Sequence, residues 1–243
     1  MTKRIIFLLI LSISLCHNML AQDDDTPMIN PTATYTNYKG ETETSTNYSD
    51  NAPLTGVFVA NPTNTDGWNC YYEWRFTREN ETEPYLIRYE EDTEYVFKEA
   101  GTHLIMLYAT FTKGSKTIEY TDEYWGQEMS PLSVTISESK LIMPNAFSPN
   151  HDQRNDTYKV KEYQSLIEFH ATIYNRWGQK LYEWDDPAAE GWDGTFHGKD
   201  VKQGVYFVEV VAKGADGRTY HVRSDVNLLR GYTESTKTST GGE

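Results

Sequence analysis

The stretch that decides the fold reads GVYFVEVVAKGADGRTYHVRSDVNLLR and runs from Gly204 to Arg230. Residues 204–213 have the apolar and aromatic alternation of a β-strand, and residues 219–230 return with a similar pattern. Between them, GADG (214–217) supplies glycines that accept the positive φ of a tight turn. The stretch therefore predicts an antiparallel hairpin.

Strand patterns continue upstream of this hairpin. EFHATIYNRW (168–177) alternates and places Phe169, Ala171 and Ile173 on one face, and GQKLYEW (178–184) turns and returns. TYKV (157–160) reads as a further short strand. We therefore expect residues 141–232 to form a compact antiparallel β-sandwich.

The preceding region has the same character. CYYEWRFT (70–77) places Tyr72, Trp74 and Phe76 on one face, and further strands are expected in GVFVAN (56–61), TEYVFKEAGTHLIMLYATF (93–111) and LSVTIS (132–137). Six or seven short strands in residues 35–137 predict an immunoglobulin-like sandwich. The fold class expected is all-β, with two immunoglobulin-like antiparallel β-sandwich domains in tandem after a signal peptide.

Both ends of the chain read differently. Residues 1–21 predict a signal peptide, with Lys3 and Arg4 before an apolar run and Ala21 near a plausible cleavage point. QDDDTPMINPTAT (22–34) is expected to be an acidic linker, and residues 233–243 a disordered polar tail.

Charge and cysteine content restrict the partners. Residues 1–21 hold two basic residues and no acidic one, so their removal takes the net charge from −14 to −16. Such a charge disfavours nucleic acid as a partner. Cys16 lies in the signal peptide, so Cys70 has no partner for an intrachain disulfide. We expect Cys70 to be a small core residue beside Trp68 and Tyr72, with an intermolecular disulfide as the alternative.

The chemistry of the chain gives weak signals. Asn150, Asp152, Asn155 and Asp156 carry oxygen atoms that suit Ca²⁺, but an Asx-rich turn explains them more simply. The motifs H-x-x-x-H, G-x-S-x-G and the P-loop do not occur. We therefore expect no metal, no cofactor and no enzymatic activity.

One segment has the composition of a binding loop. IEYTDEYWGQ (118–127) places Tyr120, Tyr124 and Trp125 among polar residues, where aromatic rings can stack on a glycan or dock a protein. The alternative is that these rings fold back onto the sheet.

Four blocks in the C-terminal half follow one another in order: MPNAFSPNHDQRNDTYKV (143–160), IYNRWGQKLYEW (173–184), GWDGTFHGKDVKQGVYFVEV (191–210) and VNLLR (226–230). Together they resemble the gliding motility-associated C-terminal domain, also called the type B sorting domain of the type IX secretion system of Bacteroidota. The matching positions are Pro144, Asn145, Ala146, Phe147, Ser148, Pro149, Asn150, Asn155, Asp156, Asn175, Arg176, Trp177, Gly178, Trp192, Asp193, Gly194, Gly198, Gly204, Tyr206 and Arg230.

This resemblance implies export across the outer membrane, contact with the type IX secretion machinery, and a secreted or cell-surface location. Within the fold, we expect Trp177 and Trp192 to cover one end of the sandwich. Asp193 is expected to accept backbone hydrogen bonds while Gly194 takes a positive φ. The family pattern has GDG where this chain has HDQ (151–153), so we expect the tight backbone feature served by those glycines to be altered or lost.

YYEWRF (71–76) and YVFKEAGTHLIMLYAT (95–110) resemble the PKD and related immunoglobulin-like modules of bacterial surface proteins. That resemblance implies a spacer or adhesion module. An alternative function is therefore a carbohydrate- or protein-binding adhesin whose front domain holds a surface glycan or protein through exposed aromatics.

Overall fold

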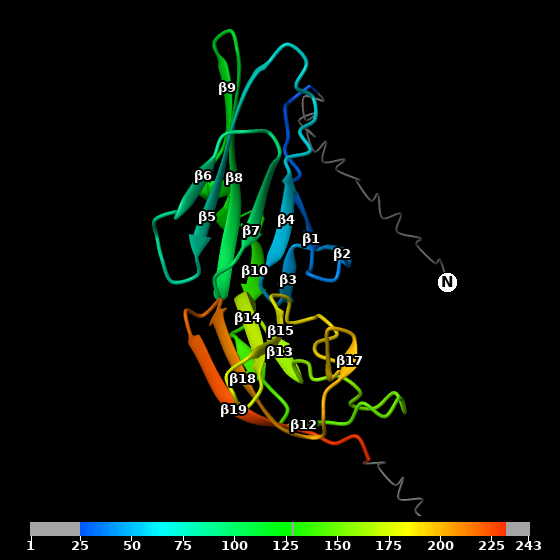
Figure 1. Cartoon of the computed structure of the whole chain (residues 1–243). Helices are drawn as coiled ribbons and strands as arrows, with labels where there is room; N and C mark the ends of the chain where they lie inside the picture. The colour runs from blue at the N-terminus through cyan, green and yellow to red at the C-terminus, as the bar shows by residue number, and fades with distance from the viewer. Residues whose placement is uncertain (1–24, 128, 232–243) are drawn as a thin grey trace, which may run out of the picture.

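The computed structural model describes residues 25–127 and 129–231 (Figure 1). The predicted signal peptide (1–21), the first part of the predicted linker (22–24) and the predicted tail (233–243) lie outside the described residues. The described chain is nearly all β and forms two immunoglobulin-like units placed end to end, as predicted. None of the helices in residues 25–127 and 129–231 has the length and apolar character needed to cross a bilayer.

Two facing sheets form the front domain. The first has the strand order β2-β1-β4-β7, and the second has the order β3-β10-β8-β5-β6, with β9 paired to β8. The strands of the first sheet are β1 (Thr32–Thr36), β2 (Thr42–Thr44), β4 (Leu54–Val59) and β7 (Thr93–Phe97). Those of the second are β3 (Asn47–Asp50), β5 (Asn69–Arg78), β6 (Leu86–Arg88), β8 (Gly101–Lys113), β9 (Lys116–Tyr120) and β10 (Leu132–Ile136).

The front domain begins earlier than predicted. Residues 28–34 belong to the sandwich, because β1 pairs with β4 and its burial alternates, with Ala33 and Tyr35 inside. Met28 forms an isolated bridge with Thr63, and Ile29 is buried. The prediction of a linker at 22–34 is therefore wrong for residues 28–34. The two prolines and the polar residues favoured a linker, although residues 32–36 alternate between buried and half-buried positions as a strand does.

The core of the front domain is aromatic. Tyr72, Trp74 and Phe76 point inward from β5, as predicted, and Trp74 and Phe76 are fully buried. Phe58 packs edge-on against Phe76 at 5.3 Å between ring centroids, a favourable geometry for aromatic pairs. The core holds one histidine, His103, which is 2% exposed on β8.

Both ring nitrogens of His103 have hydrogen-bond partners within the core. Its Nε2 donates to the carbonyl of Glu99 at 3.0 Å, and its Nδ1 accepts from the hydroxyl of Tyr85 at 2.9 Å. Burial lowers the pKa of His103 below its ordinary value of 6.5, which keeps the ring neutral.

The segment expected to expose three aromatic rings instead closes the domain. Tyr120 ends β9, and Tyr124 and Trp125 lie in the short helix α1 (Asp122–Gln127). Trp125 is 4% exposed, and Tyr124 packs against the core. The Tyr120 hydroxyl donates to the carbonyl of Pro27 at 2.8 Å. The prediction of an exposed binding loop is therefore wrong, and the fold-back alternative is confirmed.

Trp125 is buried because the second sheet has a seam, the place along β8 where its partner strand changes from β10 to β9. β8 pairs with β10 as far as Ile105 and with β9 from Ala109 onward. Leu107 lies between these two partners, and the indole Nε1 of Trp125 donates to its carbonyl at 2.8 Å. Neither β9 nor β10 pairs with β8 at Leu107, and the Trp125 indole supplies the hydrogen bond that the Leu107 carbonyl would otherwise lack.

Cys70 is exposed, so the expectation of a core position is wrong. The first three residues of β5 are all exposed, whereas its later residues alternate. The strand extends past the end of the core. Cys70 points to the same side of the sheet as Tyr72, but no described residues of the opposite sheet cover it there.

The C-terminal domain is built on one five-stranded sheet with the order β12-β19-β18-β14-β15. The long central strands confirm the predicted hairpins: β14 (Leu166–Tyr174), β15 (Lys180–Trp184), β18 (Gly204–Gly214) and β19 (Thr219–Leu228). β12 (Ala146–Phe147) adds in parallel to β19. Two short ribbons complete the domain, one of β11 (Lys140–Ile142) with β13 (Glu162–Gln164), the other of β16 (Thr195–Phe196) with β17 (Lys199–Asp200).

One predicted strand is wrong. TYKV (157–160) forms a single bridge, between Tyr158 and Trp192, and no regular strand. Tyr158 and Val160 are both buried. The segment has the composition of a strand but crosses the core as an irregular loop.

The two domains meet through backbone and hydroxyl contacts. Ser165 is 1% exposed, and its Oγ lies 2.7 Å from the Oγ of Ser137 and accepts from the Ala52 N–H at 3.1 Å. The N–H of Ala215 donates to the Ser165 carbonyl, and the N–H of Ala100 donates to the Ala215 carbonyl. The connection between the domains is therefore packed, because Ser165 and Ala215 bond to each other and also bond to front-domain residues across the junction.

Substituting Trp125 tests its place at the seam. Trp125→Ala should lower the free energy of unfolding of the front domain by about 3–5 kcal/mol, because a buried indole is lost. Trp125→Phe retains most of the apolar volume and loses the bond to Leu107, which should cost about 1 kcal/mol. Urea unfolding followed by circular dichroism measures both. A Trp125→Ala protein as stable as the wild type would show that the indole is not packed.

Candidate functional site

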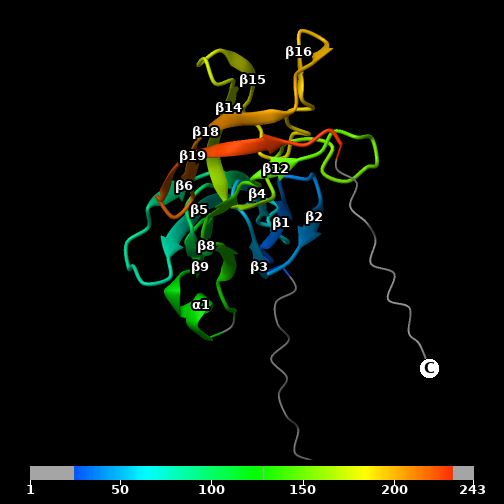
Figure 2. The ribbon, with the colours of Figure 1, turned by 60° about the horizontal axis from the view of Figure 1, so that its bottom comes forward.

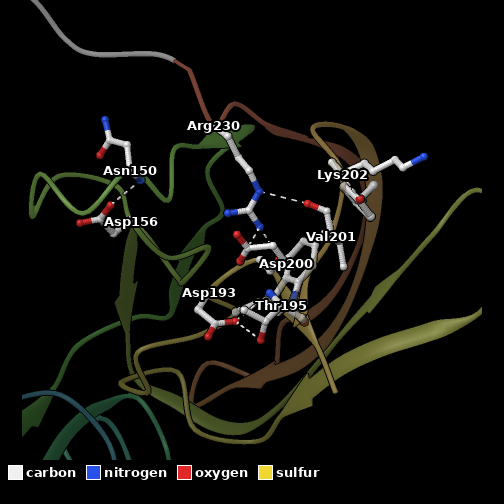
Figure 3. A network of polar contacts seen from close by, with 11 residues as sticks. Asn150, Asp156, Asp193, Thr195, Asp200, Val201, Lys202 and Arg230 are labelled. Carbon is white, nitrogen blue, oxygen red and sulfur yellow. Dashed lines mark hydrogen bonds and ion pairs between the residues drawn. The ribbon is translucent and has the colours of Figure 1, made fainter. Parts of the chain in front are cut away.

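Three of the four sequence blocks meet at one end of the C-terminal domain (Figure 3). Phe147 of the first block pairs with Leu228 of β19, and its carbonyl accepts from the Leu229 N–H at 3.0 Å. Ser148 Oγ donates to the carbonyl of Leu229 at 2.7 Å. The Asn145 carbonyl accepts from both the backbone and the side chain of Asn227. The PNAFSPN block is therefore held against the last strand.

Trp192 is the buried centre of this end. Its indole is fully buried, lies 5.3 Å from the Phe147 ring and 5.1 Å from the Tyr206 ring, and donates from Nε1 to the Thr195 carbonyl at 2.8 Å. Two backbone hydrogen bonds join Trp192 to Tyr158. The expectation that Trp192 covers one end of the sandwich is confirmed.

The two residues after Trp192 form the predicted turn. Asp193 Oδ1 accepts from the Thr195 N–H at 2.9 Å and from the Thr195 hydroxyl at 2.8 Å. Gly194 has a φ of 81°, and a Cβ there would lie 3.0 Å from Leu228 Cδ1. The positive φ therefore favours glycine at 194, and a Cβ there would also press on the Leu228 side chain.

Arg230 joins the WDG turn to the loop that precedes β18. Its Nη2 donates to the Gly194 carbonyl at 2.7 Å and its Nε donates to the Val201 carbonyl at 3.0 Å. Nη2 also lies 3.3 Å from Asp200 Oδ1 (Figure 3). One guanidinium thus holds two loop carbonyls and one carboxylate, which its planar set of donors suits.

The loop that follows the first block is organised by Asp156. Its carboxylate accepts the backbone N–H groups of Asn150 at 3.0 Å, His151 at 2.7 Å and Gln153 at 2.7 Å. Partial desolvation raises the pKa of Asp156, but the three N–H donors outweigh it and hold this pKa below its ordinary value of 3.8. The loop is therefore closed by a carboxylate acting as an acceptor.

The expectation that this loop lost its backbone geometry with the glycines is wrong. His151 and Gln153, which stand where the family pattern has glycine, have φ values of 66° and 68°, and Asn155 has 51°. The left-handed backbone is retained, because hydrogen bonds to Asp156 fix it against the steric preference of L-residues.

The same contacts bear on the calcium hypothesis. Asp152 Oδ1 accepts from the Arg154 N–H and Oδ2 accepts from the Asn150 side chain, while Asp156 accepts the three N–H groups above. Among the residues that the structure describes, no group of three or more His, Cys, Asp or Glu is placed to hold a metal ion. An Asx-rich turn accounts for the loop.

The second block (173–184) lies apart from the other three. Asn175, Arg176, Trp177 and Gly178 form the turn between β14 and β15, and Gly178 has a φ of 75°. Trp177 is 85% exposed. The expectation that it covers one end of the sandwich is therefore wrong: the turn points the ring outward.

Gly198 and Gly204 have positive φ values of 74° and 153°, and Tyr206 donates from its hydroxyl to the Lys202 carbonyl at 2.6 Å. These positions form and follow the β16–β17 ribbon. The structure thus gives most of the matching positions a structural role, in agreement with the view that the domain must fold before it is recognised.

The two domains differ in charge. Residues 25–140 contain 8 basic and 19 acidic residues, a net charge of −11, whereas residues 141–231 contain 11 basic and 13 acidic residues, a net charge of −2. The acidity of the chain therefore belongs to the front domain. The C-terminal domain is close to neutral, so it can carry a basic patch as well as an acidic one.

Glycine substitution tests the strained loop. His151→Gly and Gln153→Gly should each raise the free energy of unfolding by up to about 1 kcal/mol, because relief of the left-handed conformation exceeds the backbone entropy of glycine. Arg154→Gly, in the same loop but without a positive φ, should lower it. Thermal unfolding of the three variants compares their stabilities. Destabilisation by both His151→Gly and Gln153→Gly would contradict the left-handed conformation of these two residues.

Comparison with known proteins adds to these observations. Residues 141–222 match the family model described as the CHU_C Type IX secretion signal domain. No curated protein matches the chain.

Among solved structures, dimeric latent PorU from Porphyromonas gingivalis matches with 13% identity, 85% coverage of this chain and a TM-score of 0.25. This chain spans 20% of the PorU chain. The FN1-FN3 domains of chicken CNTN1 match with 10% identity, coverage of 73% of this chain and 64% of that one, and a TM-score of 0.24. Neural ectodermal development factor IMP-L2 matches with 13% identity, coverage of 87% and 97%, and a TM-score of 0.21.

The family match covers the first three sequence blocks and ends before the fourth, VNLLR (226–230). The fold joins the first, third and fourth blocks at one end of the sheet. Residues 141–222 therefore carry a type IX secretion signal domain of the CHU_C family, which indicates export of the chain through the type IX secretion system.

Proposed function

We propose that this chain is a non-enzymatic secreted or cell-surface protein. In this proposal a signal peptide takes it into the periplasm, and the folded C-terminal domain then directs it across the outer membrane. The observation that supports this most strongly is the match of residues 141–222 to the secretion signal domain. The front domain is the cargo.

The architecture supports an address that is read in its folded state. Trp192, Gly194 and Arg230 hold the loops of the domain together from inside, so they are largely unavailable for direct contact with a receptor. Recognition then depends on surface groups whose positions these residues fix.

The non-enzymatic part of the proposal rests on how the acidic and histidine side chains are used. His103 is buried in the core with both ring nitrogens bonded, and His170 Nδ1 lies 2.6 Å from Asp185 Oδ1 on an exposed surface. Glu90 and Glu91 are exposed. The adjacent carboxylates Glu90–Glu91 and Asp185–Asp186 are therefore interpreted as solvated surface groups.

Deletion and transfer of the domain test the export proposal. A chain that lacks residues 141–243 should accumulate in the periplasm, whereas the full chain should reach the surface or the medium. Because removal of the domain exposes the junction around Ala100, residues 141–243 should also be fused to a fluorescent protein carrying a signal peptide. Cell fractionation should find that fusion outside the cell only in a strain with an intact type IX system. Normal surface delivery of the truncated chain would refute the proposal.

A second candidate function is adhesion by the front domain, and one observation favours it. Tyr71 and Tyr89 are 51% and 59% exposed, and their ring centroids lie 6.0 Å apart with planes tilted by 40°. The Tyr71 hydroxyl donates to Glu73 at 3.3 Å, and Glu73 also holds Arg75. Two rings beside a polar row suit the C–H face and hydroxyl groups of a sugar. The acidic domain around them favours a neutral glycan.

The double variant Tyr71→Ala with Tyr89→Ala tests this candidate. It should lose at least about tenfold in affinity for a neutral polysaccharide that the wild-type chain retains, because aromatic anchors dominate such contacts. Tyr38→Ala, which removes a 42% exposed ring elsewhere on the domain, serves as the matched control. If the double variant binds neutral polysaccharides as strongly as the wild-type chain does, the adhesin candidate is contradicted.

A further inference from the structure

Trp177 differs from the other tryptophans of the chain. Trp74, Trp125, Trp184 and Trp192 are all at most 6% exposed and Trp68 is half-buried, whereas Trp177 is 85% exposed. An indole in water forgoes a large hydrophobic gain. The fold therefore displays this ring without using it for packing.

The turn that carries Trp177 is preorganised. Asn175 Oδ1 accepts from the Trp177 N–H at 2.9 Å and from the Gln179 N–H at 3.1 Å, and Asn175 Nδ2 donates to Gln179 Oε1 at 2.9 Å. A backbone bond from the Asn175 N–H to the Gln179 carbonyl closes the turn. A ring presented on a fixed backbone loses little entropy when it binds.

A groove of about 480 Å³ opens beside this ring. It lies between the β14–β15 turn on one side and Phe196 of β16 and residues 201–206 on the other. Figure 2 shows the β14–β15 and β16 regions projecting on the same side of the domain. Trp177, Phe196 and Tyr206 supply aromatic walls to this groove, called the Trp177 groove below.

The charge of the Trp177 groove is opposite to that of the chain. Its lining includes Arg176 and Lys202 and no Asp or Glu. Within the part of the chain that the structure describes, neither cation forms an ion pair. Figure 3 shows the Lys202 side chain pointing away from the contacts of Arg230. Two uncompensated cations flank an aromatic groove in a chain of net charge −14.

An apolar strip extends the Trp177 groove along β18. Val205 and Phe207 are 42% and 41% exposed on the outer face of the sheet, and Val205 also lines the groove. Tyr174 is the cross-strand partner of Phe207. Tryptophan, tyrosine and arginine beside exposed aliphatic side chains form the composition that is enriched at protein interfaces.

We propose that the Trp177 groove binds an acidic peptide segment that also carries an apolar side chain, presented by a protein of the export machinery. The inference rests on the proposed export function. The cations select carboxylates, and the strip of Trp177, Val205 and Phe207 selects apolar side chains, a combination that a peptide offers and an anionic glycan does not. The net charge of −11 on the front domain disfavours an anionic membrane surface.

The binding test uses the full chain and a fluorescein-labelled synthetic peptide of alternating glutamate and phenylalanine. Fluorescence anisotropy should show binding that weakens at least about tenfold in Trp177→Ala and in the double variant Arg176→Glu with Lys202→Glu. The double variant Arg88→Glu with Lys98→Glu makes the same change of charge on the front domain and should bind as the wild type does. Circular dichroism confirms that each variant is folded, since both groove cations and the Trp177 ring lie at the surface.

Other occupants are separate outcomes of this test. Equal binding of a lysine–phenylalanine peptide would overturn the charge selection. Binding of an anionic polysaccharide with loss of peptide binding would overturn the peptide as occupant. Self-association of the chain in sedimentation that Trp177→Ala abolishes would assign the groove to a second copy instead.

Export in cells separates this proposal from the one on which it rests. Both groove variants should reduce the exported fraction at least about tenfold, and the Arg88→Glu, Lys98→Glu control should not. If deletion of residues 141–243 abolishes export while the groove variants are exported normally, the groove proposal fails and the export function stands. If the deletion itself leaves export unchanged, the export function fails.

Discussion

The burial of Trp192 is the contact on which the C-terminal domain depends. Its indole lies between Phe147 and Tyr206, which come from segments far apart in the sequence. The Nε1 bond to Thr195 fixes the turn that follows, and the glycine of that turn presents its carbonyl to Arg230. A single buried ring thus sets the position of the first block, the WDG turn and Arg230.

This arrangement explains how a domain with one large sheet can be stable. The second layer is mostly loops and two short ribbons, which bury few backbone groups in regular pairing. Hydrogen bonds from side chains replace that pairing: Asp156 accepts three backbone N–H groups, and Arg230 donates to two carbonyls. Such bonds involve charged groups and are stronger than neutral ones, which offsets the strain of the left-handed residues His151 and Gln153.

Some tryptophans of the chain are buried and hold the fold together, whereas Trp177 is exposed at the surface. Trp125 lies in a segment of polar composition yet is buried, because its indole satisfies the Leu107 carbonyl at a seam between two strands. Trp177 lies beside a strong strand pattern yet is exposed, because Asn175 closes the turn and points the ring outward. The surface of the C-terminal domain can therefore be recognised through Trp177 while its interior is held by Trp192.

Alternation along the strands determined the all-β class, the two domains, the hairpins of residues 166–184 and 204–228, and the inward face of β5, because side-chain direction in a strand has a period of two. Four ordered blocks likewise determined the secretion signal domain, since each combines turn residues with fixed spacing. Exposure was decided by tertiary structure alone: whether a layer lies opposite a residue depends on distant segments, as Cys70 and Trp125 show. The start of the front domain at residues 28–36 depended on pairing with β4. The left-handed conformations of His151 and Gln153 depended on the hydrogen bonds that Asp156 accepts from their N–H groups. Contacts between segments far apart in the chain decide these features, and local composition does not encode them.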